Sequence, residues 1–502
     1  MLSFEEDELF KKSTVNLKKF NDLNEYIKVL KQGNEVSLIS RMHIKKGTTI
    51  LKELPKAAVV NEIYKNCSNC FKDVTTILRC SVCNLIVYCS KECQLQDWTA
   101  FHKEECEIFK KLDKALTPSL RLNLRLLINE HKKSNSLKKL KSHKSDRSEE
   151  SLETFAQMSM LLLHFVKSSS IFDENLFHAT FMIELFCKVS VNSHTIVDNE
   201  QASKGLGLYL NAAKVNHSCD PNSIVIFHRN ELSLRTVKDV EAGEEINISY
   251  IEVAEPFYVR QENLKESYFF TCNCTKCISQ SVFDKSEKVK CPNCKKFVSL
   301  SSNLAINEKI GCECNWQTET FQYFRNKKKY FFNESKELLK LKDKKIILNK
   351  VLALINEYKQ EFDDTNYQFI KFQFLKQDLN LKKLNTSKGQ IIDDFKFSEN
   401  LFLNLKSIYG FANEENKVGE KFHPRLGLQG YYVVKFGVNF FFFDDSNERS
   451  ILSVEEKKFL NLLLKYLEFS QAQLKVCFGI ESYLFKECED LKSNLEMKLR
   501  FG

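Results

Sequence analysis

The spacing of hydrophobic side chains divides the chain into segments of different type. Over residues 1–30 they recur at helical spacing, which predicts an N-terminal helical extension. Residues 35–62 and 215–250 contain short apolar runs bounded by turns, and these predict strands. Residues 152–190 favour helices, and from about residue 318 onward successive Leu-rich segments predict long helices. A chain of 502 residues with 43% hydrophobic composition can form more than one core, so several domains are expected.

A cysteine-rich segment between the two strand regions carries a specific metal-binding pattern. Its eight candidate ligands follow the spacing C-x2-C, C-x2-C, C-x3-C and H-x3-C. Zinc takes thiolate and imidazole ligands in tetrahedral geometry, so eight such groups match two sites. A segment this short buries little core, and each structural zinc can supply about 10–16 kcal/mol of folding free energy. The candidate ligands are Cys67, Cys70, Cys80, Cys83, Cys89, Cys93, His102 and Cys106.

A second cysteine cluster follows between residues 272 and 314. Its first group, C-x-C-x2-C, supplies three thiolates and needs a fourth ligand from elsewhere in the chain. Two further close pairs suggest another zinc site, for which unligated cysteine is the alternative. The candidates are Cys272, Cys274 and Cys277 with Cys219 for a third zinc, and Cys291, Cys294, Cys312 and Cys314 for a fourth.

Charge and composition narrow the class of protein. The net charge of +9 is mildly basic and does not by itself argue for nucleic acid, which is not expected as a partner. The start of the chain is acidic where a signal peptide would be basic, and no apolar run approaches the ~20 residues of a membrane span. We therefore expect a soluble cytoplasmic or nuclear protein with no membrane association, whose cysteines bind metal. A Lys/Ser-rich stretch, residues 132–151, is expected to be a mobile loop.

Two motifs in the second strand region carry a family resemblance. Asn216-His217-Ser218-Cys219-Asp220-Pro221-Asn222 is followed by Gly243-Glu244-Glu245-Ile246-Asn247-Ile248-Ser249-Tyr250, and together they resemble the SET lysine methyltransferase domain. The Cys67–Cys106 segment is similar to the MYND finger, although other two-zinc cross-brace fingers such as RING exist. A finger inserted after the first strands, followed by C-x-C-x2-C and a helical C-terminus, resembles the SET and MYND domain (SMYD) family. Phe422 to Gln429 is similar to a motif in that family's helical domain.

The resemblance implies an α+β, multidomain fold in which a β-rich SET domain is split by the finger. It implies interleaved zinc ligands, with Cys67, Cys70, Cys89 and Cys93 on one zinc and Cys80, Cys83, His102 and Cys106 on the other. The implied divisions are an N-terminal helical extension (1–30), the first part of SET (31–66), the MYND finger (67–106), a helical insertion (107–190), the SET core (191–251), a post-SET zinc-binding region (252–317) and a helical, tetratricopeptide-like domain (318–502).

The resemblance also implies roles for individual residues around S-adenosylmethionine. Tyr250 matches the catalytic-channel tyrosine, in contact with cofactor and substrate lysine, and Tyr268 resembles the second channel tyrosine. Asn216 and His217 resemble cofactor contacts, and Phe270 the residue that stacks near the adenine. Core packing is the alternative role for each aromatic side chain. We hypothesise that the zinc shared by Cys219 and the 272–277 cysteines ties the cofactor-side and channel segments together.

The implied chemistry is attack of a neutral lysine amine on the methyl group of the sulfonium cofactor. Lysine has an ordinary pKa near 10.4, and a narrow apolar channel favours its neutral form. Aromatic channel walls can also hold a cationic amine before transfer. Alignment of amine, methyl and sulfur accounts for much of the remaining acceleration.

Two positions depart from the family pattern. Glu35-Val36-Ser37-Leu38 stands where active SET domains have a Gly-Arg-Gly-like stretch, although Gly33-Asn34 lies just upstream. His194 stands near the substrate channel, where the family often has phenylalanine.

Two functions are therefore weighed. The first is a protein-lysine N-methyltransferase that acts on histone or non-histone proteins. The second is a binding scaffold with a weak or inactive SET fold. In either, the finger would recruit a proline-rich peptide, and in the scaffold the C-terminal helices would bind a peptide or chaperone tail.

Overall fold

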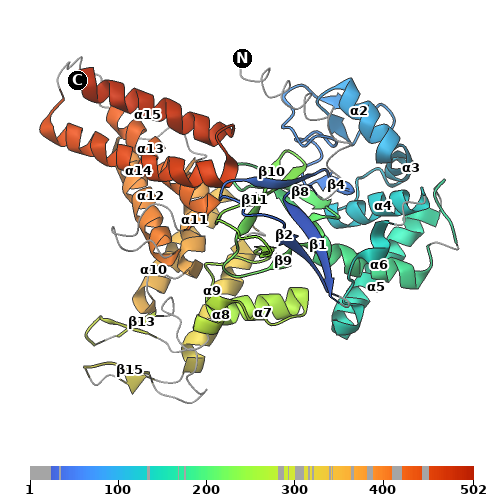
Figure 1. Cartoon of the computed structure of the whole chain (residues 1–502), viewed down its shortest axis with the longest axis horizontal. Helices are drawn as coiled ribbons and strands as arrows, with labels where there is room; N and C mark the ends of the chain where they lie inside the picture. The colour runs from blue at the N-terminus through green and yellow to red at the C-terminus, as the bar shows by residue number, and fades with distance from the viewer. Residues whose placement is uncertain are drawn as a thin grey trace. The chain divides into compact units, whose positions relative to one another are not determined.

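The computed structural model of the protein divides into two compact units, which are described separately (Figure 1). The first comprises Met1–His217, Pro221–Ile248 and Lys265–Phe270, and the second comprises Ser218–Asp220, Ser249–Leu264 and Thr271–Gly502. The residues described are 24–32, 35–132, 136–167, 169–174, 177–280, 288–291, 293–299, 310–314, 317–318, 321–338, 341, 343–362, 367–381, 388–409, 421–443 and 452–501.

The described strands of the first unit form several short sheets. One has the strand order β1-β2-β12-β9, and the others are β10-β11-β3, β4-β8-β7 and the hairpin β5-β6. The strands are β1 (Ile27–Gln32), β2 (Glu35–Ser40), β3 (Thr49–Glu53), β4 (Ala57–Val60), β5 (Leu78–Arg79), β6 (Val87–Tyr88), β7 (Ser193–Val197), β8 (Ser203–Leu208), β9 (Asn216–His217), β10 (Ser223–His228), β11 (Glu231–Thr236) and β12 (Glu245–Ile248).

Strands that precede the finger pair with strands that follow it. Leu38 of β2 lies opposite Ile246 of β12, and Leu51 of β3 lies opposite Leu234 of β11. Strand β4 pairs with β8, where the Cβ of any larger residue at Gly205 would meet the carbonyl oxygen of Val59 at 2.2 Å. The split sheet expected from the sequence is therefore present, and residues 67–106 are an insertion into it.

Helices cover the first unit, and one core cluster of this unit includes Leu122, Leu126 and Phe186. They are α2 (Lys91–Asp97), the π-helical turn η2 (Trp98–His102), α3 (Lys103–Leu112), α4 (Pro118–His131), the 3-10 turns η3 (Ser136–Lys139) and η4 (Lys144–Asp146), α5 (Glu149–Lys167), α6 (Ala179–Asn192) and the 3-10 turn η5 (Ala212–Lys214). Residues 107–190 thus contain several helices, and their division as a separate insertion stays a prediction.

Two segments differ from the sequence-based expectation. Ile27 to Leu30, expected at the end of an N-terminal helix, lie in strand β1, because β1 completes the edge of the sheet beside β2. The rest of the expected helix, residues 1–23, and Gly33-Asn34 lie outside the described residues. The Lys/Ser-rich stretch expected to be mobile contains η3 and η4, because Leu137 is buried in the core cluster and anchors it.

The second unit is mainly helical after two small hairpins. The hairpins pair β13 (Lys288–Lys290) with β14 (Phe297–Ser299) and β15 (Ile310–Gly311) with β16 (Gln317–Thr318). The helices are α8 (Thr275–Gln280), α9 (Phe321–Leu338), α10 (Lys344–Glu361), α11 (Tyr367–Leu381), α12 (Lys388–Ile408), α13 (Pro424–Phe443), α14 (Val454–Phe478) and α15 (Tyr483–Phe501), preceded by α7 (Phe257–Tyr268), whose last residues belong to the first unit.

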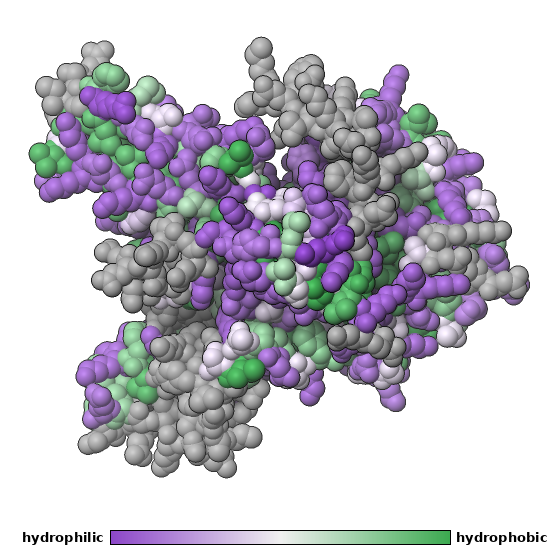
Figure 2. All heavy atoms as spheres, in the orientation of Figure 1, coloured by the Kyte–Doolittle hydropathy of each residue, from purple (hydrophilic) through white to green (hydrophobic). Residues whose placement is uncertain are grey.

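Small residues let the C-terminal helices approach closely. A Cβ at Gly437 of α13 would lie 2.5 Å from Leu463 of α14, and one at Gly427 would lie 2.9 Å from Leu474. The long helices predicted after residue 318 are therefore observed, and their assignment to the tetratricopeptide type stays a prediction. Within the described residues, none of the helices is both long and apolar enough to span a membrane, and hydrophilic residues dominate the face drawn in Figure 2.

Candidate zinc centres and cofactor-side residues

Four thiols converge in the first half of the finger. The Cys89 Sγ lies 3.5 Å from that of Cys70 and 3.6 Å from that of Cys93. A tetrahedral site with Zn–S bonds of about 2.3 Å has sulfur–sulfur distances of about 3.8 Å, whereas a disulfide requires about 2.05 Å. The hydroxyl of Ser90 caps α2 by accepting from the Cys93 N–H, which fixes that ligand's position. The donor set therefore fits a zinc ion, with ligands Cys67, Cys70, Cys89 and Cys93.

The second tetrad joins the middle and the end of the finger. The Sγ atoms of Cys80 and Cys106 are 3.7 Å apart, and Cys83 Sγ lies 3.5 Å from His102 Nε2. The four ligand atoms, from Cys80, Cys83, His102 and Cys106, lie within 4.8 Å of one another and belong to buried residues. The interleaved pairing implied by the family resemblance is therefore the pairing that the structure forms.

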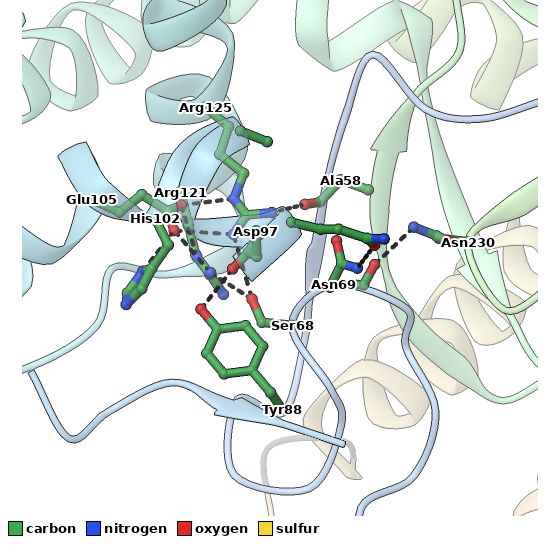
Figure 3. Close-up of polar contacts among 12 residues, drawn as sticks. Ala58, Ser68, Asn69, Tyr88, Asp97, His102, Glu105, Arg121, Arg125 and Asn230 are labelled. Carbon is green, nitrogen blue, oxygen red and sulfur yellow. Dashed lines mark hydrogen bonds and ion pairs between the residues drawn. The ribbon is translucent and has the colours of Figure 1, made fainter. Parts of the chain in front are cut away.

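A buried carboxylate, that of Glu105, contacts the second ring nitrogen of His102 (Figure 3). The Nδ1 atom of His102 lies 3.4 Å from Glu105 Oε2, on the side of the ring opposite the thiols. Histidine ligands of zinc commonly donate their second ring N–H to a carboxylate, which fixes the tautomer and the ring orientation. Glu105 occupies this position one helical turn further along the chain.

Two arginines of helix α4 hold Glu105 in place. Arg121 donates to Glu105 through Nε and Nη2, both at 3.0 Å. Arg125 donates through Nε at 2.8 Å and Nη2 at 3.0 Å. Burial alone would raise the pKa of Glu105, but the two guanidinium charges hold it well below its ordinary value. Glu105 is therefore a carboxylate with no exposed surface, neutralised by paired cations.

The same network extends from the finger to strand β4. Arg125 contacts Asp97 Oδ1 at 2.8 Å and donates to the carbonyl oxygen of Ala58 at 2.9 Å. The Tyr88 hydroxyl donates to Asp97 Oδ2 at 2.9 Å, and Arg121 donates to Ser68 Oγ at 2.8 Å. Two carboxylates and two guanidiniums thus balance in a space without water access, and they join the finger to the sheet.

A third cysteine tetrad forms in the second unit. Cys219 Sγ lies 4.0 Å from Cys272 and 3.5 Å from Cys277, and with Cys274 they form a tetrad within 4.8 Å. The side chain of Gln261 accepts from the Cys272 N–H at 2.9 Å and donates to its carbonyl oxygen at 2.8 Å, which locks the backbone of that ligand. The prediction that Cys219 completes this site is consistent with the geometry, and the donor set fits zinc.

A fourth tetrad lies beside the two hairpins of the second unit. Cys291 and Cys314 have Sγ atoms 3.5 Å apart, and those of Cys294 and Cys312 are 3.4 Å apart. The backbone of Cys291 closes the turn to Lys295 and Lys296, as in a metal-binding knuckle. The four sulfurs lie within the range of a zinc site, so the two pairs inferred from the sequence come together.

Three of the predicted cofactor-side residues belong to the first unit, and two of them are in contact. Strand β9, Asn216–His217, pairs in parallel with β12. The Asn216 amide donates to the Val36 carbonyl oxygen at 3.2 Å and to Glu245 Oε1 at 2.7 Å, so it links β2 to β12. The His217 ring lies 5.9 Å from that of Phe270, at an interplanar angle of 57°.

The predicted channel residues are divided between the units. Tyr268 ends helix α7 in the first unit, and burial raises the pKa of its hydroxyl. His194 lies on β7, where its ring meets the edge of Tyr209 at 5.9 Å. Tyr250 belongs to the second unit, two residues after the end of β12.

Comparison with known proteins identifies the finger. The family model described as the MYND finger matches residues 67–106. This range spans all eight ligands of the first two tetrads. Residues 67–106 form a MYND finger.

Curated relatives extend the similarity beyond the MYND finger. The chain is 31% identical over 259 residues to Histone-lysine N-methyltransferase ASHR1 of Arabidopsis thaliana, covering 48% of this chain and 52% of the relative. It is 31% identical over 260 residues to Histone-lysine N-methyltransferase SMYD3 of Mus musculus, covering 50% and 60%. It is 29% identical over 325 residues to N-lysine methyltransferase SMYD2 of Gallus gallus, covering 63% and 69%. The chain thus spans between about half and two thirds of the length of these curated relatives.

A solved structure also aligns with the chain. The SET domain of LSMT bound to lysine and AdoHcy covers 100% of both chains, with a TM-score of 0.32 and 12% identity.

The sequence did not reveal the ionic network behind the MYND finger. Glu105, Arg121 and Arg125 are charged residues on amphipathic helices, where such residues usually face solvent. The available signal was the spacing of Arg121 and Arg125, which are four residues apart and hence on one face of α4. Both follow closely on the last zinc ligand, Cys106.

His194 should make the protein less stable in mild acid. Burial lowers its pKa to about 4, whereas the ring titrates near 6.5 in an unfolded chain. The unfolded state therefore takes up a proton between pH 6.5 and 4 that the folded state does not. His194 thus costs almost no stability above about pH 7.5 and about 2 kcal/mol at pH 5. Between pH 7.5 and pH 5, the free energy of unfolding should fall by about 2 kcal/mol less in His194→Phe than in the wild type. Urea unfolding at the two pH values measures this difference.

Exposed His131 provides the control for this pH dependence. His131→Phe should follow the wild-type profile at both pH values. A His194→Phe profile that is parallel to the wild type would contradict the proposed desolvation of this ring.

Proposed function

We propose that this protein is an S-adenosylmethionine-dependent protein-lysine N-methyltransferase. The observation that carries the proposal is the contact of the His217 ring with Phe270 in the first unit. Cys219 follows His217 by two residues, and Cys272 follows Phe270 by two residues. The two cysteines belong to the same tetrad. The similar curated proteins are named as lysine methyltransferases, which supports the same reaction.

The residues around Asn216 are compatible with the cofactor. S-Adenosylmethionine carries positive charge on its ammonium and sulfonium groups, and both are stabilised by nearby carboxylates. Glu245 contacts the Asn216 amide, and Glu35 is exposed at the start of β2 next to Val36, which Asn216 also contacts. An acidic side chain therefore takes the place of the expected glycine, and it complements the charge of the ligand.

The aromatic residues would serve the cofactor and the lysine. Phe270 and the His217 ring offer planar faces to an adenine, and the bound cofactor supplies the methyl group. Tyr268 is partly buried, and this burial raises the pKa of its hydroxyl. A dry aromatic wall disfavours the lysine ammonium and so favours the neutral nucleophile. Tyr250 would place its hydroxyl beside the methyl group.

Calorimetric titration with S-adenosylmethionine tests this function. We expect saturable binding to the purified chain and methyl transfer to a lysine-containing protein. Tyr250→Phe should slow methyl transfer by about tenfold to a hundredfold through the loss of alignment, with cofactor affinity nearly unchanged. Methyl transfer would be followed with radiolabelled cofactor, using unmodified histones and a cell extract as substrates.

Two results would count against this function. Turnover by Tyr250→Phe equal to that of the wild type would remove the hydroxyl from the mechanism. An absence of heat at millimolar cofactor would instead favour the scaffold function, in which the SET fold binds partners without catalysis.

The partners belong to the same proposal. The MYND finger would recruit a proline-rich segment, and exposed apolar side chains on the finger, Val82 at 52% and Leu95 at 66%, are available for one. The C-terminal helices would bind a peptide such as a chaperone tail. Substrates would be histone or non-histone proteins, encountered in the cytoplasm, the nucleus or both.

A further inference from the structure

The Lys/Ser-rich stretch makes specific contacts that the proposed function has not used. The Lys141 carbonyl oxygen accepts from Asn192 Nδ2 at 2.9 Å, and Arg147 donates to the Cys187 carbonyl oxygen at 3.2 Å. Both partners lie on helix α6 of the same unit. The turn between Lys141 and Arg147 is therefore fixed to α6 at its two ends.

Phe269 has a backbone conformation that requires support. Its φ of 65° lies in the left-handed region, immediately after the end of helix α7 at Tyr268. Glycine is the usual residue at such a helix end, because a side chain makes this conformation costly. A phenylalanine persists there only when contacts of its ring offset the cost.

The turn supplies those contacts. The His143 ring stacks on Phe269 with centroids 5.4 Å apart and an interplanar angle of 22°. The Arg147 guanidinium lies over the same ring, 4.8 Å from its centroid. Stacking and cation–π contacts of this kind each contribute measurably to the position of a ring. Two residues from a distant part of the sequence thus contact the Phe269 ring.

We propose that His143 and Arg147 form an aromatic clamp that positions the Tyr268–Phe270 segment for cofactor and substrate lysine. Phe269 lies between the residue assigned to the channel and the residue assigned to the adenine. Its φ sets the relative direction of the two neighbouring side chains, so fixing its ring fixes both. The clamp residues are positioning residues that need not touch the cofactor, and this proposal rests on the methyltransferase function proposed above.

The clamp can be altered without opening a buried cavity. His143 also lines an open hollow of about 650 Å³, together with Lys141, Lys144 and Leu152. Truncation at His143 therefore leaves a space that water can fill, and the variant should fold. Zinc content and circular dichroism would verify this in each variant.

The test compares S-adenosylmethionine affinity, by calorimetry, among variants of the full chain. We expect His143→Ala and Arg147→Ala each to weaken binding about fivefold to tenfold, because each removes one contact of about 1 kcal/mol from the positioned ring. His143→Phe keeps the stacked ring and should bind within about twofold of the wild type. Lys138→Ala, an exposed cation of the same stretch, is the matched control and should bind like the wild type.

Phe269→Gly separates positioning from stability. Glycine accepts the left-handed conformation without cost, so the melting temperature should stay the same or rise. The positioned ring is lost, so cofactor affinity should still fall, and KM for the cofactor should rise more than kcat falls. A purely structural role would move stability and affinity in the same direction.

The outcomes separate this proposal from the function on which it rests. If the wild type binds S-adenosylmethionine and both alanine variants bind it with the same affinity, the clamp is overturned. The methyltransferase function would then still stand. No binding by the wild type, with folded, zinc-loaded protein, would overturn both. Weakened binding in the alanine variants, restored in His143→Phe, would support the clamp.

Discussion

Replacing Glu105 by alanine is expected to destabilise the first unit by about 3–5 kcal/mol. The substitution leaves the guanidiniums of Arg121 and Arg125 without the carboxylate that each contacts twice, in a site with no exposed surface. It also removes the group behind His102, so zinc should leave the Cys80-Cys83-His102-Cys106 site faster, by about tenfold to a hundredfold. Urea unfolding and the rate of zinc transfer to a colorimetric chelator measure the two effects.

A glutamate on the same helix provides the control. Glu107 accepts hydrogen bonds from Ser170 at the surface, and Glu107→Ala should cost less than about 1 kcal/mol with zinc release unchanged. Glu105→Gln keeps the shape but not the charge, and should be intermediate. Equal stability of Glu105→Ala and the wild type would show that the ionic network contributes nothing to holding the MYND finger.

Cys272→Ser should remove one zinc and most of the cofactor affinity together. Serine is a poor zinc ligand, so the tetrad completed by Cys219 should lose its metal and the free energy that goes with it, about 10–16 kcal/mol for structural sites in small peptides. Because Cys272 follows Phe270 by two residues and Cys219 follows His217 by two, the loss should free both segments. We expect one zinc equivalent fewer by mass spectrometry, and S-adenosylmethionine binding weakened at least about tenfold.

Cys477→Ala is the matched variant for this experiment. Cys477 is buried in helix α14 and belongs to none of the cysteine groups found in the described part of the chain. Its substitution should leave zinc content and cofactor affinity unchanged. Wild-type cofactor binding by a Cys272→Ser protein that lacks the zinc would separate this metal from the cofactor site.

Local patterns were predictable from the sequence. The ligands of the MYND finger lie within one short segment, and their number and type match two zinc sites. Which four residues share each zinc was inferred from the family resemblance. The long C-terminal helices and the strands after Val215 follow from hydrophobic periodicity. The family resemblance suggested that Cys219 shares a zinc with the later cysteines, and the tetrad geometry agrees with that inference.

Features that depend on distant partners were not predictable. Ile27 and Leu30 fit a helical pattern, and pairing with β2 decides that they form a strand. The composition of the Lys/Ser-rich stretch is typical of a mobile loop, but Leu137 and the contacts of Arg147 with α6 hold it in place. Arg121 and Arg125 become buried only because the MYND finger brings Asp97 and Glu105 to them.

The split sheet has a consequence for the order in which the protein forms during synthesis. Leu38 stays unpaired until its partner, Ile246, has been synthesised roughly 200 residues later. At ordinary elongation rates this interval is about 10–40 s. The MYND finger needs only its own short segment and two metal ions, so it can fold during that interval. Once folded, it shortens the flexible part of the loop that the late strands must span. Zinc supply during translation would then set how long the early strands stay unpaired and open to aggregation.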